Sequence, residues 1–353
     1  MSESVEHPRK ANIHDVARRA ESSPATVSRV LSGSSYPVSE AMRRRIVEAA
    51  AELNYTANAI GRMLKTNDTH EIGVIVPTIA NPFYAQIVVG IEKEAKERGY
   101  GMLLCNTLRD ATDEDRYVET LFGKQVMGIA LSSVAVDHAR LRALQRKGLK
   151  VVFIDQEPSD ANSGKVGLDF IRGGMLAAAH LLSNGHRSCA YFTAPLDKRS
   201  RVEVLEGFRL EHALRGRSLD PRHVLVDERE EESEESVYEF ECGRRLARRF
   251  LALTGRPTAV LAANDMIAIG AMQEFAARGV SVPDDVSVVG YDNIMLASLV
   301  RPGLTTVDPR SNEIGRLACR ALVDMMEGET PEIRHVKVEP VLVERGSVKR
   351  PRA

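Results

Sequence analysis

The apolar residues between positions 12 and 53 recur at intervals of three and four, which is the spacing of one face of a helix. The first two segments carry Ile13, Val16, Ala17 and Ala20, then Val27, Val30 and Leu31. Asn12 with Asp15 three residues later has the pattern of a capping box, and Ser23 before Pro24 marks a second helix start. The pattern therefore predicts a helix–turn–helix.

A third helix is predicted to begin after Ser39. Its apolar stripe consists of Met42, Ile46, Ala49, Ala50 and Leu53. Three arginines at 43–45 lie beside this stripe, on surface that could face phosphates. A helix–turn–helix presents the start of its second helix to the DNA major groove, although small helical hairpins without this function show the same pattern.

From residue 72 onward, short and almost continuous apolar runs alternate with helical segments. The expected strands are 72–77, 101–106, 127–133, 150–155, 165–169, 188–193, 223–226, 258–264 and 286–292. The expected helices include 82–98, 113–123, 137–147, 170–184, 201–215 and 310–327. Apolar strands that alternate with helices predict parallel sheets covered on both faces, arranged here as two α/β lobes.

Composition narrows the class of protein. No apolar run reaches the ~18 residues of a membrane span, and the polar start MSESVEHPRK lacks the apolar core of a signal peptide. The four cysteines include no CxxC pair, and the nine histidines form no ligand-spaced cluster. Motifs of NTPases, zinc proteases, α/β-hydrolases and dinucleotide-binding enzymes are also missing. We therefore expect a cytoplasmic protein with reduced thiols, without enzymatic activity, cofactor or metal.

The charge is distributed unevenly along the chain. Residues 1–65 carry ten Lys or Arg against seven Asp or Glu, whereas the remainder is mildly acidic. A basic end on an acidic body fits a DNA-binding protein. The most acidic stretch, DEREEESEE at 227–235, is interpreted as a solvated surface insertion.

Two stretches carry a resemblance to a known family. DVARRAESSPATVSRVLSG (15–33) and AELNYTANAIGRMLK (51–65) resemble, in order and spacing, the headpiece and hinge of the lac repressor/galactose repressor family of bacterial transcription regulators. The resemblance covers roughly residues 11–348. It implies an all-α helix–turn–helix headpiece with a hinge helix, followed by a two-lobed α/β effector domain with parallel sheets, like that of periplasmic binding proteins.

The expected domains follow from the pattern and the resemblance together. They are the headpiece at 1–55, the hinge helix and connector at 56–71, an effector-binding and dimerisation domain at 72–348, and a tail at 349–353. In the family the chain recrosses between the lobes. We therefore expect lobe 1 at about 72–164 and 295–328, and lobe 2 at about 165–294 and 329–348.

The resemblance assigns base reading to Pro24 and Ala25, which begin the recognition helix, and to Arg29. Pro24 and Ala25 can make only apolar contacts. Arg29 can bind a guanine bidentately, which provides ~1–3 kcal/mol of discrimination. We therefore assign most of the major-groove specificity to Arg29, and expect Thr26 and Ser28 to serve phosphates or the helix itself.

The hinge is expected to contact DNA in a different way. In the family this helix orders on operator DNA, pairs with its dimer mate and inserts a leucine into the minor groove; the matching residue is Leu64, although an ordinary core leucine is the alternative. Asn58, Arg62 and Lys65 are further expected contacts. Gly61 stands where the family usually has alanine, and glycine disfavours helix by ~1 kcal/mol. We therefore predict a hinge that depends strongly on DNA for folding.

Effector-binding residues are expected just after the strands, because ligands of α/β lobes bind beyond the carboxyl ends of strands. Phe83 and Tyr84 follow the first strand and present aromatic faces. Asn264 and Asp292 follow strands of the second lobe and match family effector positions, although Asn264 also suits a helix N-cap. Tyr238 lies where some relatives place a stacking aromatic.

Residues 193–208 depart from the family pattern. Val204 stands where many sugar-binding relatives have an arginine that points into the pocket. Lys198, Arg199 and Arg201 lie upstream, and a guanidinium there would favour an anionic ligand, unless these cations lie on the surface. The effector class therefore stays open between a neutral sugar, a sugar acid or phosphate, and no small ligand.

The expected function is sequence-specific transcription regulation, most simply repression. Two headpieces that read two half-sites predict a homodimer on a roughly palindromic double-stranded operator. A small effector of the carbohydrate class is expected between the lobes, and no membrane partner. The alternative is a solute-binding protein of the sugar-binding type without DNA regulation, against which the helix–turn–helix argues.

Overall fold

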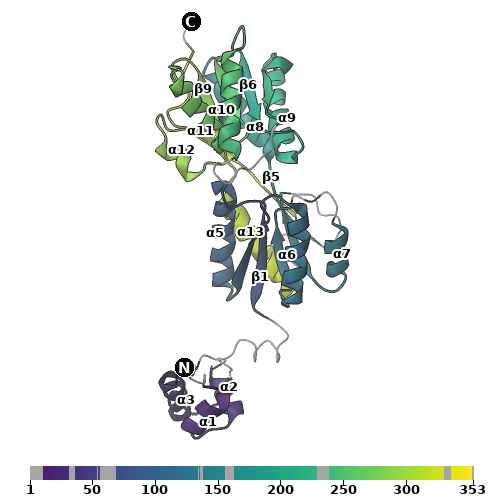
Figure 1. The fold of residues 1–353 in the computed structure, drawn as a ribbon, viewed down its shortest axis with the longest axis vertical. Helices are drawn as coiled ribbons and strands as arrows, with labels where there is room; N and C mark the ends of the chain where they lie inside the picture. The colour runs from purple at the N-terminus through teal and green to yellow at the C-terminus, as the bar shows by residue number, and fades with distance from the viewer. Residues whose placement is uncertain are drawn as a thin grey trace, which may run out of the picture. The chain divides into compact units, whose positions relative to one another are not determined.

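The computed structural model describes residues 11–31, 36–53, 55, 69–133, 135, 138–155, 163–228, 238–329 and 335–351. The chain forms two compact units, Met1–Thr69 and His70–Ala353. The first unit holds helices α1 to α3, and the second holds two α/β lobes (Figure 1). The helix–turn–helix headpiece and the two-lobed α/β body expected from the sequence are therefore confirmed, whereas the expected hinge helix lies outside the described residues.

The headpiece consists of α1 (Ile13–Arg19), α2 (Pro24–Leu31) and α3 (Glu40–Glu52). The Asn12 side chain caps α1, and the carboxylate of Asp15 accepts the backbone N–H of Asn12 at 3.0 Å. The hydroxyl of Ser23 accepts the backbone N–H of Thr26 at 3.1 Å, and that of Ser39 caps α3. These side chains satisfy N–H groups that lack a partner within the helix, so the predicted helix starts are confirmed.

The apolar faces of the three helices pack into one small core. Its buried members are Val16, Ala17, Ala20, Val27, Val30, Ile46, Ala49 and Ala50. Arg45 of α3 closes the turn between α1 and α2, because its guanidinium donates to the Ala20 carbonyl at 2.6 Å and to the Glu21 carboxylate at 3.1 Å. Glu21 takes a positive φ of 48° in this turn. Arg45 therefore braces the helix–turn–helix, a role that the sequence did not indicate.

The body contains two six-stranded sheets, in the orders β11-β5-β4-β3-β1-β2 and β12-β10-β9-β8-β6-β7. The strands are β1 (Glu71–Val76), β2 (Gly101–Asn106), β3 (Gly128–Leu131), β4 (Lys150–Ile154), β5 (Gly164–Leu168), β6 (Cys189–Thr193), β7 (Val224–Val226), β8 (Ala259–Ala262), β9 (Ser287–Tyr291), β10 (Thr305–Asp308), β11 (His335–Val338) and β12 (Val341–Val343). The expected strands are all present. Among the described strands the pairing is parallel except between β10 and β12.

Helices cover both faces of each sheet. In the first lobe these are α5 (Pro82–Glu97) and α13 (Ser311–Met326) on one face, and α6 (Ala111–Gly123) and α7 (Ala139–Gln145) on the other. In the second lobe they are α8 (Phe170–Ser183) and α9 (Arg199–Leu214), opposite α10 (Tyr238–Leu251) and α11 (Asp265–Ala277), with the short α12 (Met295–Leu299) and a 3-10 turn at Pro221–His223. Helix α10 was not expected from the sequence. No helix among the described residues is long and apolar enough to cross a membrane.

The chain passes between the lobes three times. Strand β5 belongs to the first sheet, and the helix that follows it, α8, packs in the second lobe. Strand β10 belongs to the second sheet, whereas α13 packs on β3, β4 and β5 of the first. Strands β11 and β12 then pair with β5 and β10 respectively.

These pairings correct three parts of the expected lobe assignment. Residues 165–168 and 335–338 belong to the first lobe, not the second, and residues 305–308 belong to the second lobe, not the first. The physical reason is that an apolar strand buries equally well in either sheet. Its hydrophobic pattern therefore does not identify its partner.

Two helices of the second lobe cross so closely that their backbones touch. A Cβ atom at Gly207 of α9 would overlap the carbonyl oxygen of Ile171, and one at Gly174 of α8 would overlap that of Val204. Glycine is therefore required at both positions for the approach of the helices, not for a turn.

Candidate functional site

The exposed face of α2 carries the residues that were expected to read bases. Ala25 and Arg29 are both exposed and lie four residues apart, which places them on one side of the helix. Pro24, Thr26 and Ser28 are half-buried. The guanidinium carbon of Arg29 lies 4.0 Å from the ring centroid of Tyr36. The face can therefore present one long cationic side chain beside small apolar ones.

Thr26 takes part in the structure of the helix start. Its hydroxyl lies 2.8 Å from that of Ser23, which also accepts the Thr26 backbone N–H. This contact supports the local role expected for Thr26. The hinge residues Asn58, Gly61, Arg62, Leu64 and Lys65 lie outside the described residues.

Five side chains from the two lobes gather at the ends of strands and the starts of helices. They are Tyr84 in the first turn of α5, Arg109 after β2, Asp155 after β4, Glu239 in the first turn of α10, and Asp292 after β9. We call them the interlobe cluster. The charges of the other four all affect the pKa of the Tyr84 hydroxyl, and Arg109 and Glu239 are in direct contact. The carboxyl ends of parallel strands are where ligands of α/β lobes bind.

Asp155 and Asp292 occupy equivalent positions in the two lobes. Their strands, β4 and β9, are each third in the order of their sheet. The backbone N–H of Asp155 donates to Val166 of β5 at 2.9 Å, and that of Asp292 donates to Val307 of β10 at 2.8 Å. Both aspartates take positive φ values, 70° and 116°, which are uncommon outside glycine and concentrate at functional sites.

Desolvation determines how these groups hold protons. It raises the pKa of Asp155 well above its usual value, against the opposing charges of Arg199 and Lys165. Desolvation also raises the pKa of Asp292 well above its usual value, and the neighbouring carboxyls of Asp265, Glu239 and Asp308 add to this. Protonated carboxyl groups can both donate and accept hydrogen bonds, and the desolvated surroundings that raise their pKa disfavour charged groups in general.

Hydrogen bonds join the lobes beside the cluster. Arg109 forms an ion pair with Glu239, which also accepts a hydrogen bond from the Asn81 amide at 3.4 Å. The Gln86 amide of α5 donates to the backbone carbonyl of Asn293 in the second lobe at 3.3 Å. The arrangement of the two lobes is therefore held by polar contacts at the cluster.

The aromatic residues expected to line the site lie in or next to the cluster. Phe83 and Tyr84 are half-buried, and their rings meet edge to face with centroids 5.1 Å apart. Desolvation raises the pKa of Tyr84 to about 12, so its hydroxyl stays protonated. Tyr238 is buried, and its ring centroid lies 5.9 Å from the guanidinium carbon of Arg109.

The two arginines upstream of Val204 are engaged with protein groups. The Nε of Arg199 donates to Glu203 at 2.5 Å, and Arg201 donates to the Pro195 carbonyl at 2.8 Å. Val204 itself is buried. Lys198 is half-buried in the N-cap position of α9.

Arg199 also lines a cavity of 390 Å³ together with residues of the first lobe. The lining residues are Asp155, Lys165, Gly167, Leu168, Arg199, Val336 and Lys337. The cavity therefore adjoins the interlobe cluster through Asp155.

Asn264 caps α11, because its side-chain oxygen accepts the backbone N–H of Ile267 at 2.8 Å. Its neighbour Asp265 is fully buried and accepts the hydroxyl of Thr306 at 2.6 Å and the backbone N–H of Ile294 at 2.9 Å. Asp265 therefore fixes the loop that carries Asp292, and Asn264 has the capping role that the sequence allowed.

Three members of the cluster were not expected from the sequence. Asp155 ends the run VVFID as Asp292 ends VVGYD, so the repeated strand-end aspartate was a signal that could have found it. Arg109 and Glu239 are 130 positions apart and carry no local signal. Among the described residues, no group of three or more His, Cys, Asp or Glu side chains could hold a metal ion.

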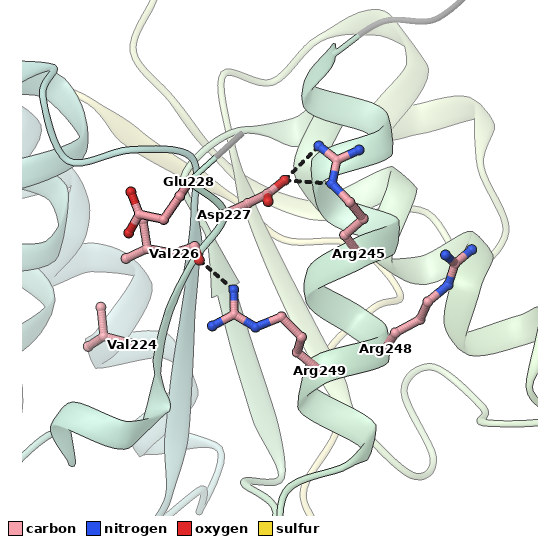
Figure 2. A pocket seen from close by; sticks show the side chains of 7 residues that line it. All are labelled: Val224, Val226, Asp227, Glu228, Arg245, Arg248 and Arg249. Atoms are coloured by element: carbon pink, nitrogen blue, oxygen red, sulfur yellow. Dashed lines mark hydrogen bonds and ion pairs between the residues drawn. The ribbon is translucent and has the colours of Figure 1, made fainter. Parts of the chain in front are cut away.

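Figure 2 shows a second cavity, of 670 Å³, between β7 and α10. Each arginine that lines it is held by the protein: Arg245 pairs with Asp227 at 2.6 Å, Arg249 donates to the Val226 carbonyl at 2.5 Å, and Arg248 pairs with Glu274. Among the residues that the structure describes, each arginine of this cavity therefore already has a protein partner. Asp227 is buried, which corrects the interpretation of 227–235 as a wholly solvated stretch; residues 229–235 lie outside the described residues.

Two family models match the chain. The model for bacterial regulatory proteins of the lacI family matches residues 12–58, which include the helix–turn–helix. The model for a periplasmic binding protein-like domain matches residues 178–348. The two matches follow the division between headpiece and body.

Similar proteins extend over almost the whole chain. The ribose operon repressor of Escherichia coli (strain K12) is 35% identical over 338 residues, which are 96% of this chain and 99% of that protein. The structure of the transcriptional regulator CelR in complex with cellobiose is 30% identical with a TM-score of 0.70, covering 96% of this chain and 99% of that one. The lac repressor dimer bound to operator and the anti-inducer ONPF is 25% identical with a TM-score of 0.80, covering 97% and 100%.

Proposed function

The chain belongs to the lacI family of bacterial regulatory proteins, and we propose that it is a repressor controlled by a neutral sugar bound at the interlobe cluster. As a member of this family it is a DNA-binding transcription regulator that acts on an operator as a dimer. The observation that carries the finer proposal is the equivalent placement of Asp155 and Asp292 at the strand ends of the two lobes.

The chemistry of the cluster favours an uncharged, hydroxyl-rich ligand. The desolvation that raises the pKa of Asp155 and Asp292 disfavours a charged group beside them, whereas each carboxyl can hydrogen-bond to sugar hydroxyls. The cations that would have supported an anionic effector, Arg199 and Arg201, are bound to Glu203 and to Asp197 and Pro195. Of the three effector classes left open by the sequence, the neutral sugar therefore fits best.

Aromatic side chains support the same choice. Phe83 and Tyr84 offer partly exposed ring faces at the start of α5. Sugar rings present apolar C–H faces that pack on such rings, while their hydroxyls need the few convergent polar groups that the strand ends supply. The names of two relatives are in keeping with this: one is a ribose operon repressor, and one was solved with cellobiose.

Ligand binding is coupled to DNA binding through the arrangement of the two lobes. A sugar held by Asp155 of one lobe and Asp292 of the other favours the lobe arrangement in which both contacts form. The coupling between operator and sugar is reciprocal, so each must change the affinity for the other by the same factor. Operator DNA as the target places this action in the cytoplasm.

The test uses the purified full-length protein and genomic fragments in a gel-retardation assay. Retarded fragments are titrated again with D-ribose and cellobiose, and with D-ribose 5-phosphate and galacturonate as anionic counterparts. We expect retardation, and a change in operator affinity with a neutral sugar alone. A response only to the anionic compounds would overturn the choice of effector, and the lack of any retarded fragment would overturn the regulatory function.

The solute-binding alternative is not favoured. The lacI-family match covers the helix–turn–helix, which a solute-binding protein without DNA regulation would not need. Sugar binding with no retarded fragment in the same assay is the outcome that would revive it.

A further inference from the structure

We propose that Tyr36 is a specificity-determining residue, which positions the guanidinium of Arg29 for recognition of a guanine edge. The proposal rests on the proposed function, because it concerns how the operator is read. It assigns a role to a tyrosine that lies outside the recognition helix. The guanidinium carbon of Arg29 lies 4.0 Å from the centroid of the Tyr36 ring.

The face and the edge of a guanidinium group make different kinds of contact. Its flat face stacks on an aromatic ring, whereas its N–H donors point outward in the plane. Bidentate pairing with the O6 and N7 atoms of guanine uses only these in-plane donors. Stacking on Tyr36 therefore leaves the recognition edge of Arg29 geometrically compatible with the base.

Arg29 gains from such positioning because its side chain is long and exposed. Arg29 lies in the last turn of α2 and is exposed, so its long side chain has many rotamers when nothing restrains it. Tyr36 restricts these before DNA arrives, which reduces the entropy lost on binding. Pro24 and Ala25 carry no hydrogen-bonding side chains, so the orientation of Arg29 bears heavily on specificity.

Packing does not explain the tyrosine. Tyr36 is 52% exposed, and it is not part of the headpiece core formed by α1 to α3. An exposed ring stacked on an exposed arginine adds little to the stability of the fold. Its replacement is therefore expected to leave the headpiece folded, which makes the proposal testable with the full chain.

The experiment starts from a random-sequence duplex library selected with the wild-type protein, which yields a consensus operator. The guanine read by Arg29 is then identified as the consensus base whose replacement no longer changes the operator affinity of the Arg29→Ala variant. Binding of Tyr36→Leu and Tyr36→Phe is measured on the consensus and on duplexes changed at that base pair. Far-ultraviolet circular dichroism of each variant verifies that the headpiece is folded.

We expect Tyr36→Leu to reduce the preference for the guanine by about two- to fivefold, the size of an exposed cation–π contact, and Tyr36→Phe to retain it. In the Arg29→Ala background, Tyr36→Leu should leave the preference unchanged, because no guanidinium remains to be positioned. An equal loss of affinity on all duplexes, or equal effects of Leu and Phe, would overturn the proposal and indicate a phosphate contact through the hydroxyl. A wild-type protein that selects no sequence would instead overturn the proposed function.

Discussion

Arg109 of the first lobe forms an ion pair with Glu239 of the second, and both side chains are largely removed from solvent, with exposed fractions of 13% and 4%. Arg109 follows β2 with a positive φ of 65°, and Glu239 lies in the first turn of α10. The pair therefore joins the lobes at the place where the effector is proposed to bind. Any ligand that changes the separation of the lobes must therefore also lengthen or shorten the Arg109–Glu239 ion pair.

Removing one partner of this pair should destabilise the body. Arg109→Ala leaves the Glu239 carboxylate buried without its main counter-charge, and breaking a buried pair in this way costs about 3–5 kcal/mol. We expect a decrease of several kcal/mol in the free energy of unfolding, measured with urea. The double variant Arg109→Met/Glu239→Gln should recover most of it, and Arg116→Ala, at an exposed arginine of α6, is the control. A loss no larger than that of the control would mean that the pair is solvated.

Asp292→Asn should weaken the effector response and leave operator binding intact. A hydrogen bond between neutral groups contributes about 0.5–1.5 kcal/mol, so we expect the sugar concentration for half-maximal response to rise by roughly 2- to 10-fold. The measurement is operator binding titrated with sugar. Asp284→Asn is the matched control, because Asp284 is exposed and pairs with Lys349. Unchanged sugar sensitivity of Asp292→Asn would remove this residue from the site.

Two arginines of the headpiece should separate specificity from affinity. Arg29→Ala should cost about 1–3 kcal/mol on the consensus operator and abolish the preference for one base pair. Arg44→Ala, at an exposed position of α3, should weaken binding equally on all sequences and reduce its salt dependence, as a phosphate contact does. Binding isotherms on operator variants at two salt concentrations distinguish the two cases. A uniform loss of affinity with Arg29→Ala would contradict its role as base reader.

A matched pair of glycine substitutions tests the close helix crossing. Gly207→Ala forces a Cβ atom onto the Ile171 carbonyl, and overpacking against backbone costs about 1–3 kcal/mol or more. Gly123→Ala, at the end of α6, meets no atom within 4 Å and should stabilise the protein by up to about 1 kcal/mol through helix propensity. Urea unfolding of both variants measures the difference. Similar effects of the two would argue against backbone contact at Gly207.

The stability of the body should depend on pH through Asp265. Burial raises the pKa of this carboxyl to about 7, although the Thr306 hydroxyl and the Ile294 N–H oppose the shift. The folded state therefore binds a proton that the unfolded chain releases near its ordinary pKa of 3.8. The contribution of this proton to the free energy of unfolding is fully present below pH 3.8 and is lost as pH rises toward about 7.

Asp265→Asn keeps an acceptor at this position without the titrating proton. Its unfolding free energy should vary less between pH 4 and 7 than that of the wild type, measured by denaturant unfolding at several pH values. Asp284→Asn, at a solvent-exposed aspartate, is again the control. A profile identical to that of the wild type would show that Asp265 does not titrate in this range.

The sequence by itself determined the parts whose cause is local. Asn12, Ser23 and Ser39 start helices because a side-chain oxygen meets a nearby backbone N–H, so these starts could be read from a few residues. Strands β1 to β9 were likewise visible as apolar runs, whereas β10, β11 and β12 were not expected, and the spacing of the headpiece motifs indicated the family. Asp292 was visible because it directly follows such a run.

Only the tertiary structure decided which distant residues meet. The sheet to which β5 belongs is defined by its pairing with β4 and β11, not by the composition of the strand. Arg109 pairs with Glu239, Asp155 matches Asp292, and Arg45 braces the turn at Glu21, because the topology brings together segments between 24 and 137 positions apart. The contact between Tyr36 and Arg29 joins residues only seven positions apart (36 − 29), but hydrophobic periodicity does not indicate it either. Hydrophobic periodicity specifies which face of an element is buried, whereas pair contacts arise from the path of the chain between the elements.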